Sequence, residues 1–567
     1  MRALIIGLLL LASPAYGDII INGLDDEKTR GVRSFISLTD DCSLPRWTVR
    51  YRYRNADNEI RQALQSWGYY TPEIEKSLTF GSDCWHAVFD IDPGQPVIIR
   101  HLDVELAGDG RDDEALNDVL RNPAIAKGER FDHEVYESFK NLLDQTATGR
   151  GYFDATFTTR EVIVQPEQHA ADVRLVFDTG PRYRFGEVVF ENASLTEVLM
   201  SRYLTFDMTD YYDAEKISEL YQAVLSSGYF EDVTVQTRID EQNHLVPVTV
   251  QLTPVDPDKT RVGIGFSTDI GPKASLSYSN LRLNQHGQRL NTDLSWSPVR
   301  KEAGMEYRLP ADKHRNGWTS VYAGLLEEDP DTSWSRRYTL GARQLVPRSH
   351  GWFESRFIEI IDDRFDVADD EGYNFSVVPG IGWSHSSTSA SRRPLRGHTF
   401  NAEFSTTSEA LGSTINYSSV VLHAKFLHGL WPGGRVITKG RVGATFTDDF
   451  DRLQPSVRFF SGGDDRIRGY DFKSVGPVDE NGQVIGGNRV VEASVEVDQL
   501  VHKNWAVAVF VDAGNATLDR FATELETGAG VGVRWYSPLG PLRLDVAAPV
   551  RSEESGVRMH ISFGPDI

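Results

Sequence analysis

Apolar and polar residues follow two different periods along this chain, and the period changes near its middle. In the first half, apolar residues recur at helical spacing, as at Ile60, Ala63, Leu64 and Trp67. Three such stretches end at a glycine followed by aromatic residues, and an alternating, strand-like pattern comes next. We expect each glycine to end its helix in a left-handed conformation and the aromatic residues to begin the next strand. The three glycines are Gly68, Gly151 and Gly228.

Each repeat is predicted to form a β-α-α-β-β module in which two helices cover one face of a small sheet. We assign the modules to residues 18–95, 96–181 and 182–257. The edge strands of such a sheet are open, and an open edge can accept an extended peptide by strand addition. The alternative is a stack of spacer modules that binds no ligand.

From residue 260 to residue 567 the helical period disappears. Short segments of alternating polarity recur between Gly, Asn, Asp and Pro turns, and we count sixteen of them. The even number and the weak alternation favour a transmembrane β-barrel of sixteen strands over a soluble sandwich. Closure into a barrel also removes the sheet edges that lipid cannot hydrogen-bond.

Composition narrows the choice of function. The formal net charge is -23, from 59 Lys and Arg against 82 Asp and Glu, which argues against a nucleic-acid-binding protein. No stretch approaches the roughly 20 apolar residues of a transmembrane helix, so an ordinary helical membrane protein is excluded.

The first residues predict export. Arg2 is followed by the apolar run 3–12 and by a small-x-small site at 15–17, which is typical of a signal peptide cleaved between Gly17 and Asp18. The alternative is a buried N-terminal helix.

Export makes the two cysteines of the chain informative. Cys42 and Cys84 are expected to form a disulfide in an oxidising compartment. In the chain-entropy model a bond that closes such a loop contributes about 4 kcal/mol to stability. A zinc site is disfavoured, because neither cysteine belongs to a CxxC pair.

The longest stretch without a strand pattern in the second half is residues 447–487, and a loop of this length is usually functional. It contains Arg468-Gly469-Tyr470, and Phe510-x-Asp512-x-Gly514 follows two strands later. These motifs, with the barrel and the repeats, resemble the BamA/TamA-type outer-membrane assembly and secretion factors. The repeats look like their polypeptide-transport-associated (POTRA) domains. With three such domains, and with the residues 540–545 near its C-terminal end, the chain is most similar to the TamA branch, the translocation and assembly module subunit.

The resemblance implies that the loop folds back into the barrel lumen, where Arg468 pairs with Asp512. An Arg can satisfy a carboxylate on a wet inner wall bidentately. Gly469 allows a sharp turn, and the ring of Tyr470 can pack while its hydroxyl stays hydrated. The alternative is a flexible loop in which both charges are solvated.

The resemblance also implies a function. It is the insertion or translocation of unfolded outer-membrane proteins, such as autotransporters and other β-barrels, in contact with outer-membrane lipid and lipopolysaccharide. The partner implied is a TamB-like periplasmic protein anchored in the inner membrane.

The two ends of the barrel predict a weak seam. The first strand, expected at residues 261–268, carries Gly263, Ile264 and Gly265, and glycine weakens a strand. The last strand reaches Phe563 and is followed by residues that favour a bend and lack a ladder donor, Gly564 and Pro565. We therefore expect few hydrogen bonds across the seam and an edge that a client strand can join. The alternative is an ordinary closed barrel with a frayed end.

We expect no enzymatic activity, no cofactor and no metal, since the motifs of hydrolases, metalloproteases and P-loop enzymes do not occur. Gly528, Gly530 and Gly532 favour a strand with one small face over a nucleotide site. His502 and His560 are expected to be solvated or interfacial. Two other functions stay open: a two-partner-type secretion pore, which usually has two modules and a plug helix, and a passive porin, which lacks the modules.

Overall fold

The computed structural model describes residues 18–82, 84–311, 317–368, 370–388, 391, 393–537, 540–550 and 556–563. The predicted signal peptide, including Gly17, lies outside the described residues, and Asp18 is the first residue described. In these ranges no helix is both long enough and apolar enough to cross a membrane.

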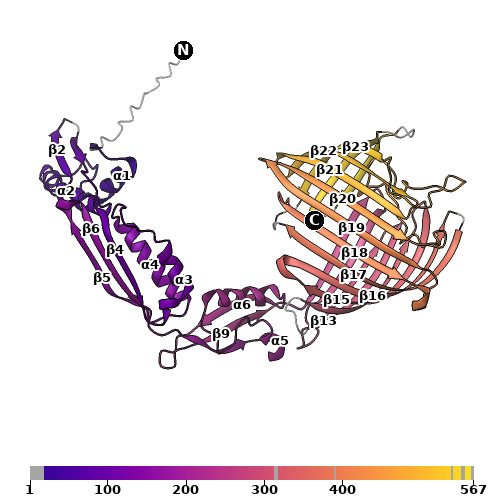
Figure 1. Cartoon of the computed structure of the whole chain (residues 1–567). Coiled ribbons are helices and arrows are strands. Elements are labelled where there is room, and N and C mark those ends of the chain that lie inside the picture. Colours follow the sequence, from indigo (N-terminus) through magenta and orange to yellow (C-terminus); the bar gives the residue numbers. More distant parts are fainter. Residues whose placement is uncertain are drawn as a thin grey trace, which may run out of the picture. The chain divides into compact units, whose positions relative to one another are not determined.

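Three modules come first, and each combines two α-helices with a three-stranded sheet (Figure 1). The last strand of each module lies in the middle of its sheet, in the orders β1-β3-β2, β4-β6-β5 and β7-β9-β8. Outer strands are therefore left as edges. The elements of the first module are β1 (Asp18–Asn22), α1 (Asp26–Phe35), α2 (Arg46–Ser66), β2 (Glu73–Phe80) and β3 (Trp85–Asp92). Those of the second are β4 (Ile98–Ala107), α3 (Glu114–Arg121), α4 (His133–Gly149), β5 (Thr156–Gln165) and β6 (Ala170–Asp178). Those of the third are β7 (Arg184–Glu191), α5 (Glu197–Ser201), α6 (Ala214–Ser226), β8 (Phe230–Thr237) and β9 (Leu245–Pro254).

The apolar residues predicted at helical spacing pack into the module cores. In the first module Ile60, Ala63 and Leu64 of α2 are buried in one cluster with Phe89 of β3. The glycine that ends the helix, Gly68, has a φ of 82°. Gly151 and Gly228 also have positive φ, so the expected left-handed helix ends are confirmed.

The expectation for the aromatic residues after each glycine was right for one module only. Phe230 begins β8, but β2 and β5 begin later, at Glu73 and Thr156. In the second module the reason is burial: Tyr152 is 2% exposed and its hydroxyl donates to Asp113. Its ring packs in the core and so does not continue the strand.

Cys42 and Cys84 form a disulfide in the first module, with their Cα atoms 5.4 Å apart. The bond joins the segment before α2 to the segment before β3. It lies beside the module core, since Cys84 packs against the buried cluster.

The second half forms a closed barrel of sixteen strands, β10 to β25, in which consecutive strands pair antiparallel (Figure 1). The first strand begins at Asp258, three residues before the position expected from the sequence. The strands are β10 (Asp258–Ser267), β11 (Gly271–Asn280), β12 (Arg289–Trp296), β13 (Arg300–Pro310), β14 (Trp318–Glu328), β15 (Ser333–Pro347), β16 (Trp352–Val367), β17 (Asp370–Thr388), β18 (Gly397–Thr407), β19 (Tyr417–Trp431), β20 (Gly434–Phe446), β21 (Arg489–His502), β22 (Trp505–Thr517), β23 (Glu526–Ser537), β24 (Gly540–Pro549) and β25 (Arg558–Phe563).

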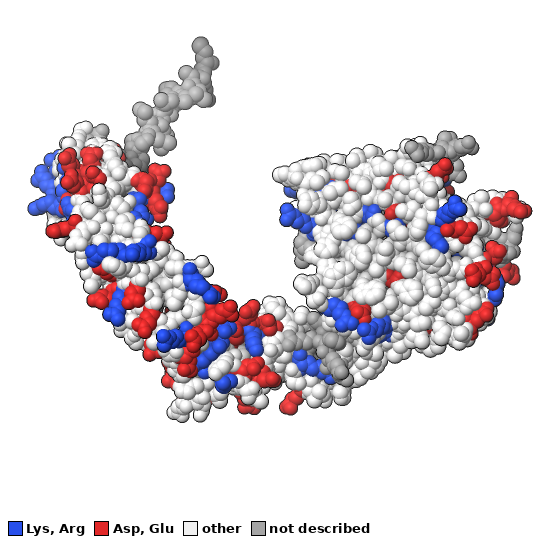
Figure 2. Space-filling model, in the orientation of Figure 1, with Lys and Arg blue, Asp and Glu red and all other residues white. Residues whose placement is uncertain are grey.

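Alternation along each strand separates an apolar outer wall from a polar inner one. On β22, Val509 and Val511 are exposed, whereas Phe510 and Asp512 are buried. Figure 2 shows the visible outer wall of the barrel as a broad band with few charged residues, and charges gather toward its rims. This is the pattern of a barrel whose outer face meets lipid.

Candidate functional site

The inward loop, residues 447–487, follows β20, and its middle packs against the inner wall formed by the last strands. Arg468, near its middle, is 6% exposed. Its Nε donates to Oδ2 of Asp512 at 2.7 Å and its Nη2 donates to Oδ1 at 2.9 Å. The contact is a bidentate, charge-assisted pair between the loop and β22.

Arg468 also reaches two further carboxylates on neighbouring strands. Its Nη1 donates to Glu496 on β21 at 2.7 Å and to Asp545 on β24 at 3.2 Å. Arg534 on β23 binds the same two acids, with Nη2 2.9 Å from Glu496. Two arginines therefore bridge three buried carboxylates, and the network joins four consecutive strands to the loop. We call these five residues the anchor network.

The wall is shaped to receive the loop. The guanidinium carbon of Arg468 lies 3.3 Å from the ring centroid of Phe510, which gives a cation–π contact in addition to the ion pairs. A Cβ on Gly528 would lie 1.8 Å from the carbonyl oxygen of Arg468, and one on Gly530 would lie 2.5 Å from the ring of Phe510. The GxGxG stretch thus keeps the inner face small where the loop lies on it, as the strand interpretation predicted.

The two residues after Arg468 hold the loop in place. Gly469 has a φ of 101°, and its N–H donates to Nε2 of His560 at 2.9 Å. Tyr470 is 5% exposed, and its hydroxyl donates to Glu526 at 2.7 Å. We expected that hydroxyl to be hydrated. It is bound to a carboxylate instead, because Glu526 at the start of β23 faces the loop.

Gly514, the last residue of the second motif, lies away from the loop. A Cβ there would lie 2.6 Å from the carbonyl oxygen of Val491 on the adjacent strand. Gly514 therefore permits close packing of β22 on β21, whereas Phe510 and Asp512 contact Arg468 directly.

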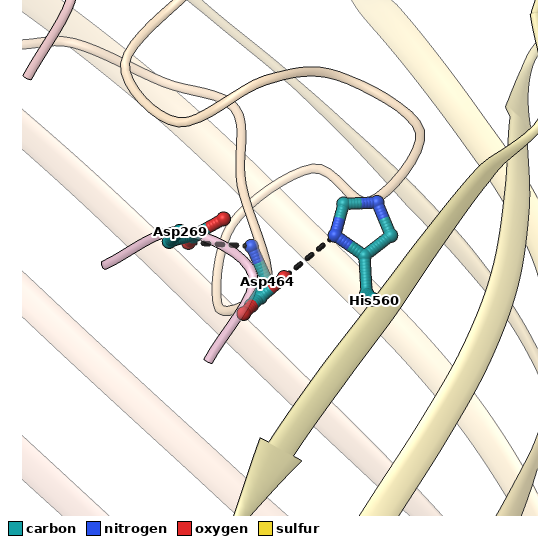
Figure 3. A group of neighbouring side chains, drawn as sticks. All are labelled: Asp269, Asp464 and His560. Atoms are coloured by element: carbon teal, nitrogen blue, oxygen red, sulfur yellow. Dashed lines mark hydrogen bonds and ion pairs between the residues drawn. The ribbon is translucent and has the colours of Figure 1, made fainter. Parts of the chain in front are cut away.

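The expectation that His560 is solvated or interfacial was wrong, whereas His502 is exposed. His560 is 6% exposed and lies beside Asp464 of the inward loop and Asp269, which follows β10 (Figure 3). Its Nδ1 is 2.6 Å from Oδ1 of Asp464. Asp269 and Asp464 belong to no recognisable motif and are far apart in the chain, so nothing in the sequence points to this group.

The seam is where the first barrel strand, β10, meets the last, β25. In the part of the chain that the structure describes, its registered pairing is a single pair, Ser267 with Ser562, whereas β10 and β11 are paired along the whole of β10. The N–H of Thr268 adds one bond to the carbonyl of Ile561 at 3.3 Å. Gly263, Ile264 and Gly265 lie on the stretch of β10 beyond this pair, and Phe563 is the last residue described. Gly564 and Pro565 lie outside the described residues.

Residues 257–565 match the Omp85 superfamily domain, residues 18–93 match a model described as POTRA domain TamA domain 1, and residues 183–254 match one described as surface antigen variable number repeat. The Omp85 match covers more than half of the chain and includes the whole described barrel.

Curated relatives are outer membrane protein assembly factors named BamA. The one from Nitratidesulfovibrio vulgaris is 22% identical over 475 residues, which make up 78% of this chain and 58% of the relative. The one from Neisseria meningitidis serogroup B is 23% identical over 471 residues, or 70% of this chain and 59% of the relative. The chain thus spans less than two thirds of the length of these relatives.

A solved structure shares the fold. It is the crystal structure of BamA from Haemophilus ducreyi lacking POTRA domains 1–3, which aligns with a TM-score of 0.67 at 17% identity. The alignment covers 82% of this chain and 99% of that one.

Proposed function

The chain belongs to the Omp85 superfamily, and we propose that it is a TamA-like assembly factor that inserts or translocates outer-membrane proteins by templating their strands at its seam. The barrel lies in the outer membrane and the POTRA domains lie in the periplasm. The clients we propose are unfolded autotransporters and other β-barrel proteins. The role is non-enzymatic, because the chemistry it needs is strand pairing and not bond cleavage.

The pairing at the seam is the observation that carries this proposal. Residues 258–266 of β10 have no registered partner among the described residues of β25. An edge strand presents unpaired N–H and C=O groups, and such groups are costly where lipid replaces water. An incoming client strand would satisfy them, so strand addition at this edge is favourable. The side chains on that stretch are also suited to lipid, since Val262 and Ile264 are 78% and 83% exposed.

The test is a disulfide across the seam. Because Ser267 and Ser562 are a registered pair, the crosslink is placed there. The variant Ser267→Cys with Ser562→Cys should block client insertion into proteoliposomes when oxidised and regain it on reduction. The matched control is Ser275→Cys with Ser295→Cys, a registered serine pair between β11 and β12. Unchanged insertion by the oxidised seam variant would refute the seam mechanism.

The alternative function is a two-partner-type secretion pore. It would require the groups that now fill the barrel lumen to move aside so that a polypeptide could pass. The anchor network ties the inward loop to four strands. At the other end of the lumen, Arg393 from the turn between β17 and β18 pairs with Asp498, which Arg435 also binds at 2.8 Å. A polypeptide passing through the lumen would have to break both groups of buried ion pairs. Single-channel conductance separates the two functions, because a pore gives a large and steady conductance.

The periplasmic partner we propose is TamB-like and inner-membrane-anchored, and the match of residues 18–93 to a TamA domain supports it. We assign its binding surface to the outer face of α2. Trp47 and Tyr51, one turn apart, are 72% and 59% exposed, beside the exposed Arg46 and Arg50. Trp, Tyr and Arg are the residue types that dominate binding energy at protein interfaces. In Figure 2 basic residues gather on this part of the first module.

The partner assignment predicts that Trp47→Ala with Tyr51→Ala weakens binding of the purified partner's periplasmic domain at least tenfold, as for loss of interface hot spots of about 2 kcal/mol. Ile239→Ala in the third module, which also truncates an exposed apolar residue, is the control. Equal binding by both variants would remove α2 from the interface.

A further inference from the structure

One carboxylate of the inward loop contacts both strands of the seam. Oδ2 of Asp464 accepts a hydrogen bond from Ser267 Oγ at 2.7 Å, and Oδ1 accepts one from Thr268 Oγ1 at 2.6 Å. Both donors lie at the end of β10. On the other strand, His560 Nδ1 of β25 lies 2.6 Å from Oδ1 of the same residue (Figure 3). Asp464 therefore bridges two strands whose described residues form one registered pair.

The protonation state of His560 follows from its neighbours. The N–H of Gly469 points to Nε2 at 2.9 Å, so Nε2 must offer its lone pair. The remaining ring nitrogen, Nδ1, then carries the hydrogen and donates it to Asp464. Two contacts from one loop thus hold the same imidazole, one from the backbone next to the anchor and one from Asp464.

The tautomer of His560 also argues against a metal ion bound at this group of side chains. Asp269, Asp464 and His560 bring ligand-type atoms within 4.8 Å of one another. A metal ion between them would need the Nδ1 lone pair, but that nitrogen is the one that carries the hydrogen. The hydroxyls of Ser267 and Thr268 likewise direct their hydrogens to Asp464. The group is a closed hydrogen-bond network around one carboxylate.

The loop backbone is built to reach the seam. Asp269 Oδ2 accepts from the N–H of Asp464 at 2.8 Å, which fixes the start of the contact. Gly463, the residue before it, has a φ of 105°, and a Cβ there would lie 2.5 Å from the same Asp269 oxygen. Only glycine fits at position 463, and the backbone turn there places Asp464 beside the end of β10.

We propose that Asp464 is a latch that holds the seam closed, and that the inward loop must shift before the seam opens. The proposal rests on the proposed strand addition at the seam. Because the POTRA domains precede β10, its Asp258 end is periplasmic and the latch lies at the extracellular end of the seam. Asp464 is a positioning residue: it sets how often the edge of β10 becomes free, and the client meets that edge elsewhere along the strand.

The experiment measures seam opening without a client, by hydrogen exchange of the full-length protein in nanodiscs. Asp464→Ala should speed exchange in peptides from β10 and β25 by about ten- to a hundredfold, as for lost hydrogen bonds to a charged group. Asp465→Ala is the matched control. It is the adjacent loop carboxylate, it is exposed, and it makes no contact with the seam in the described residues. Ser267→Ala, which removes one hydroxyl donor to Asp464, should give a smaller increase. Thr268→Val is not used, because Thr268 Oγ1 also accepts the N–H of Ile561 across the seam at 3.4 Å.

The outcomes separate the latch from the proposed function. Seam exchange that is the same in Asp464→Ala and in Asp465→Ala overturns the latch, whatever happens to client insertion. Faster seam exchange with unchanged client insertion supports the latch and contradicts insertion at the seam. If Asp464→Ala does not fold, Ser267→Ala carries the test, and unchanged exchange in that variant overturns the latch. If Ca²⁺, Mg²⁺ or Zn²⁺ slows seam exchange in the unmodified protein but not in Ser267→Ala, the group binds a cation and the latch proposal is refuted.

Discussion

Replacing Arg468 by alanine tests how the inward loop is held. The side chain bridges Asp512, Glu496 and Asp545, and Arg534 is the second cation of the network. With both arginines the network has two positive and three negative charges. Without Arg468 it has one positive and three negative charges on a wall that is shielded from water.

The expected loss of stability comes from the buried carboxylates that lose Arg468 as their partner. Removing one partner of a buried ion pair costs about 3–5 kcal/mol, since the remaining charge keeps its desolvation penalty. Loss of the stacking on Phe510 adds about 0.5–2 kcal/mol. Asp512 keeps two hydrogen bonds, from Ser494 Oγ at 2.6 Å and from the backbone N–H of residue 468 at 3.1 Å, which soften the loss and favour the lower end of the range.

The network also changes what a charge swap should do. From the two sequence motifs alone, Arg468→Asp with Asp512→Arg would be expected to restore the contact. In the structure the new carboxylate would lie beside Glu496 and Asp545, so three acids would crowd one site. We therefore expect the double variant to be no more stable than Arg468→Ala.

Urea unfolding in lipid vesicles, followed by tryptophan fluorescence, measures the loss, and heat-modifiability on gels reports the folded barrel. The control is Arg364→Ala on β16, an exposed arginine without a hydrogen bond or ion pair in the described residues, for which a change within about 0.5 kcal/mol is expected. If Arg468→Ala is as stable as Arg364→Ala, the loop is not anchored by this network. Rescue by the charge swap would show that the Asp512 contact acts alone.

Three further predictions concern other parts of the chain. Gly528→Ala should displace the inward loop and expose it to protease, because its Cβ would lie 1.8 Å from a loop carbonyl oxygen, whereas Gly304→Ala, with open space around it, should not. Burial raises the pKa of Asp113, but the hydrogen bond and charge of Arg150 outweigh it and lower that pKa below 3.8. Second-module stability should therefore be complete above pH 3.8 and fall as pH drops through the lowered pKa, a loss that Asp113→Asn abolishes in acid unfolding of the full chain. Mass mapping of non-reduced peptides should find the disulfide of the first module, and its removal should destabilise that module by about 4 kcal/mol.

The parts of the fold that could be predicted from the sequence are those in which apolar and polar positions alternate with a short period. The strand number of the barrel and the order of elements in each module follow from alternation at two residues and at three to four residues. The helix-ending glycines were also readable, since a left-handed residue is a local requirement. The start of β2 and β5 was not, because the burial of a ring such as Tyr152 depends on contacts made elsewhere in the module.

The residues of the candidate site also divide into those that could be predicted from the sequence and those that could not. Arg468 and Asp512 belong to motifs and could be named in advance. Glu496, Asp545 and Arg534 look like any inward-facing polar residue of a barrel strand, and their role appears only when the strands are side by side. His560 did carry a signal. It alternates with Met559, which is 57% exposed, so strand parity alone would have placed it on the inner face.

The anchor network and the proposed latch together describe a loop that links the seam of the barrel to the neighbouring wall. The anchor lies on β21 to β24, which are paired over most of their length, whereas the latch reaches β25 and β10 across the seam. Arg468 and Asp464 are only four positions apart, and the N–H of Gly469 ties the anchor segment to the same imidazole that Asp464 binds. The latch can therefore be released while the anchor stays formed, but loss of the anchor removes the support on which the latch depends. The two substitutions should consequently not add: Asp464→Ala should have a large effect on the seam when Arg468 is present and a small one when it is absent.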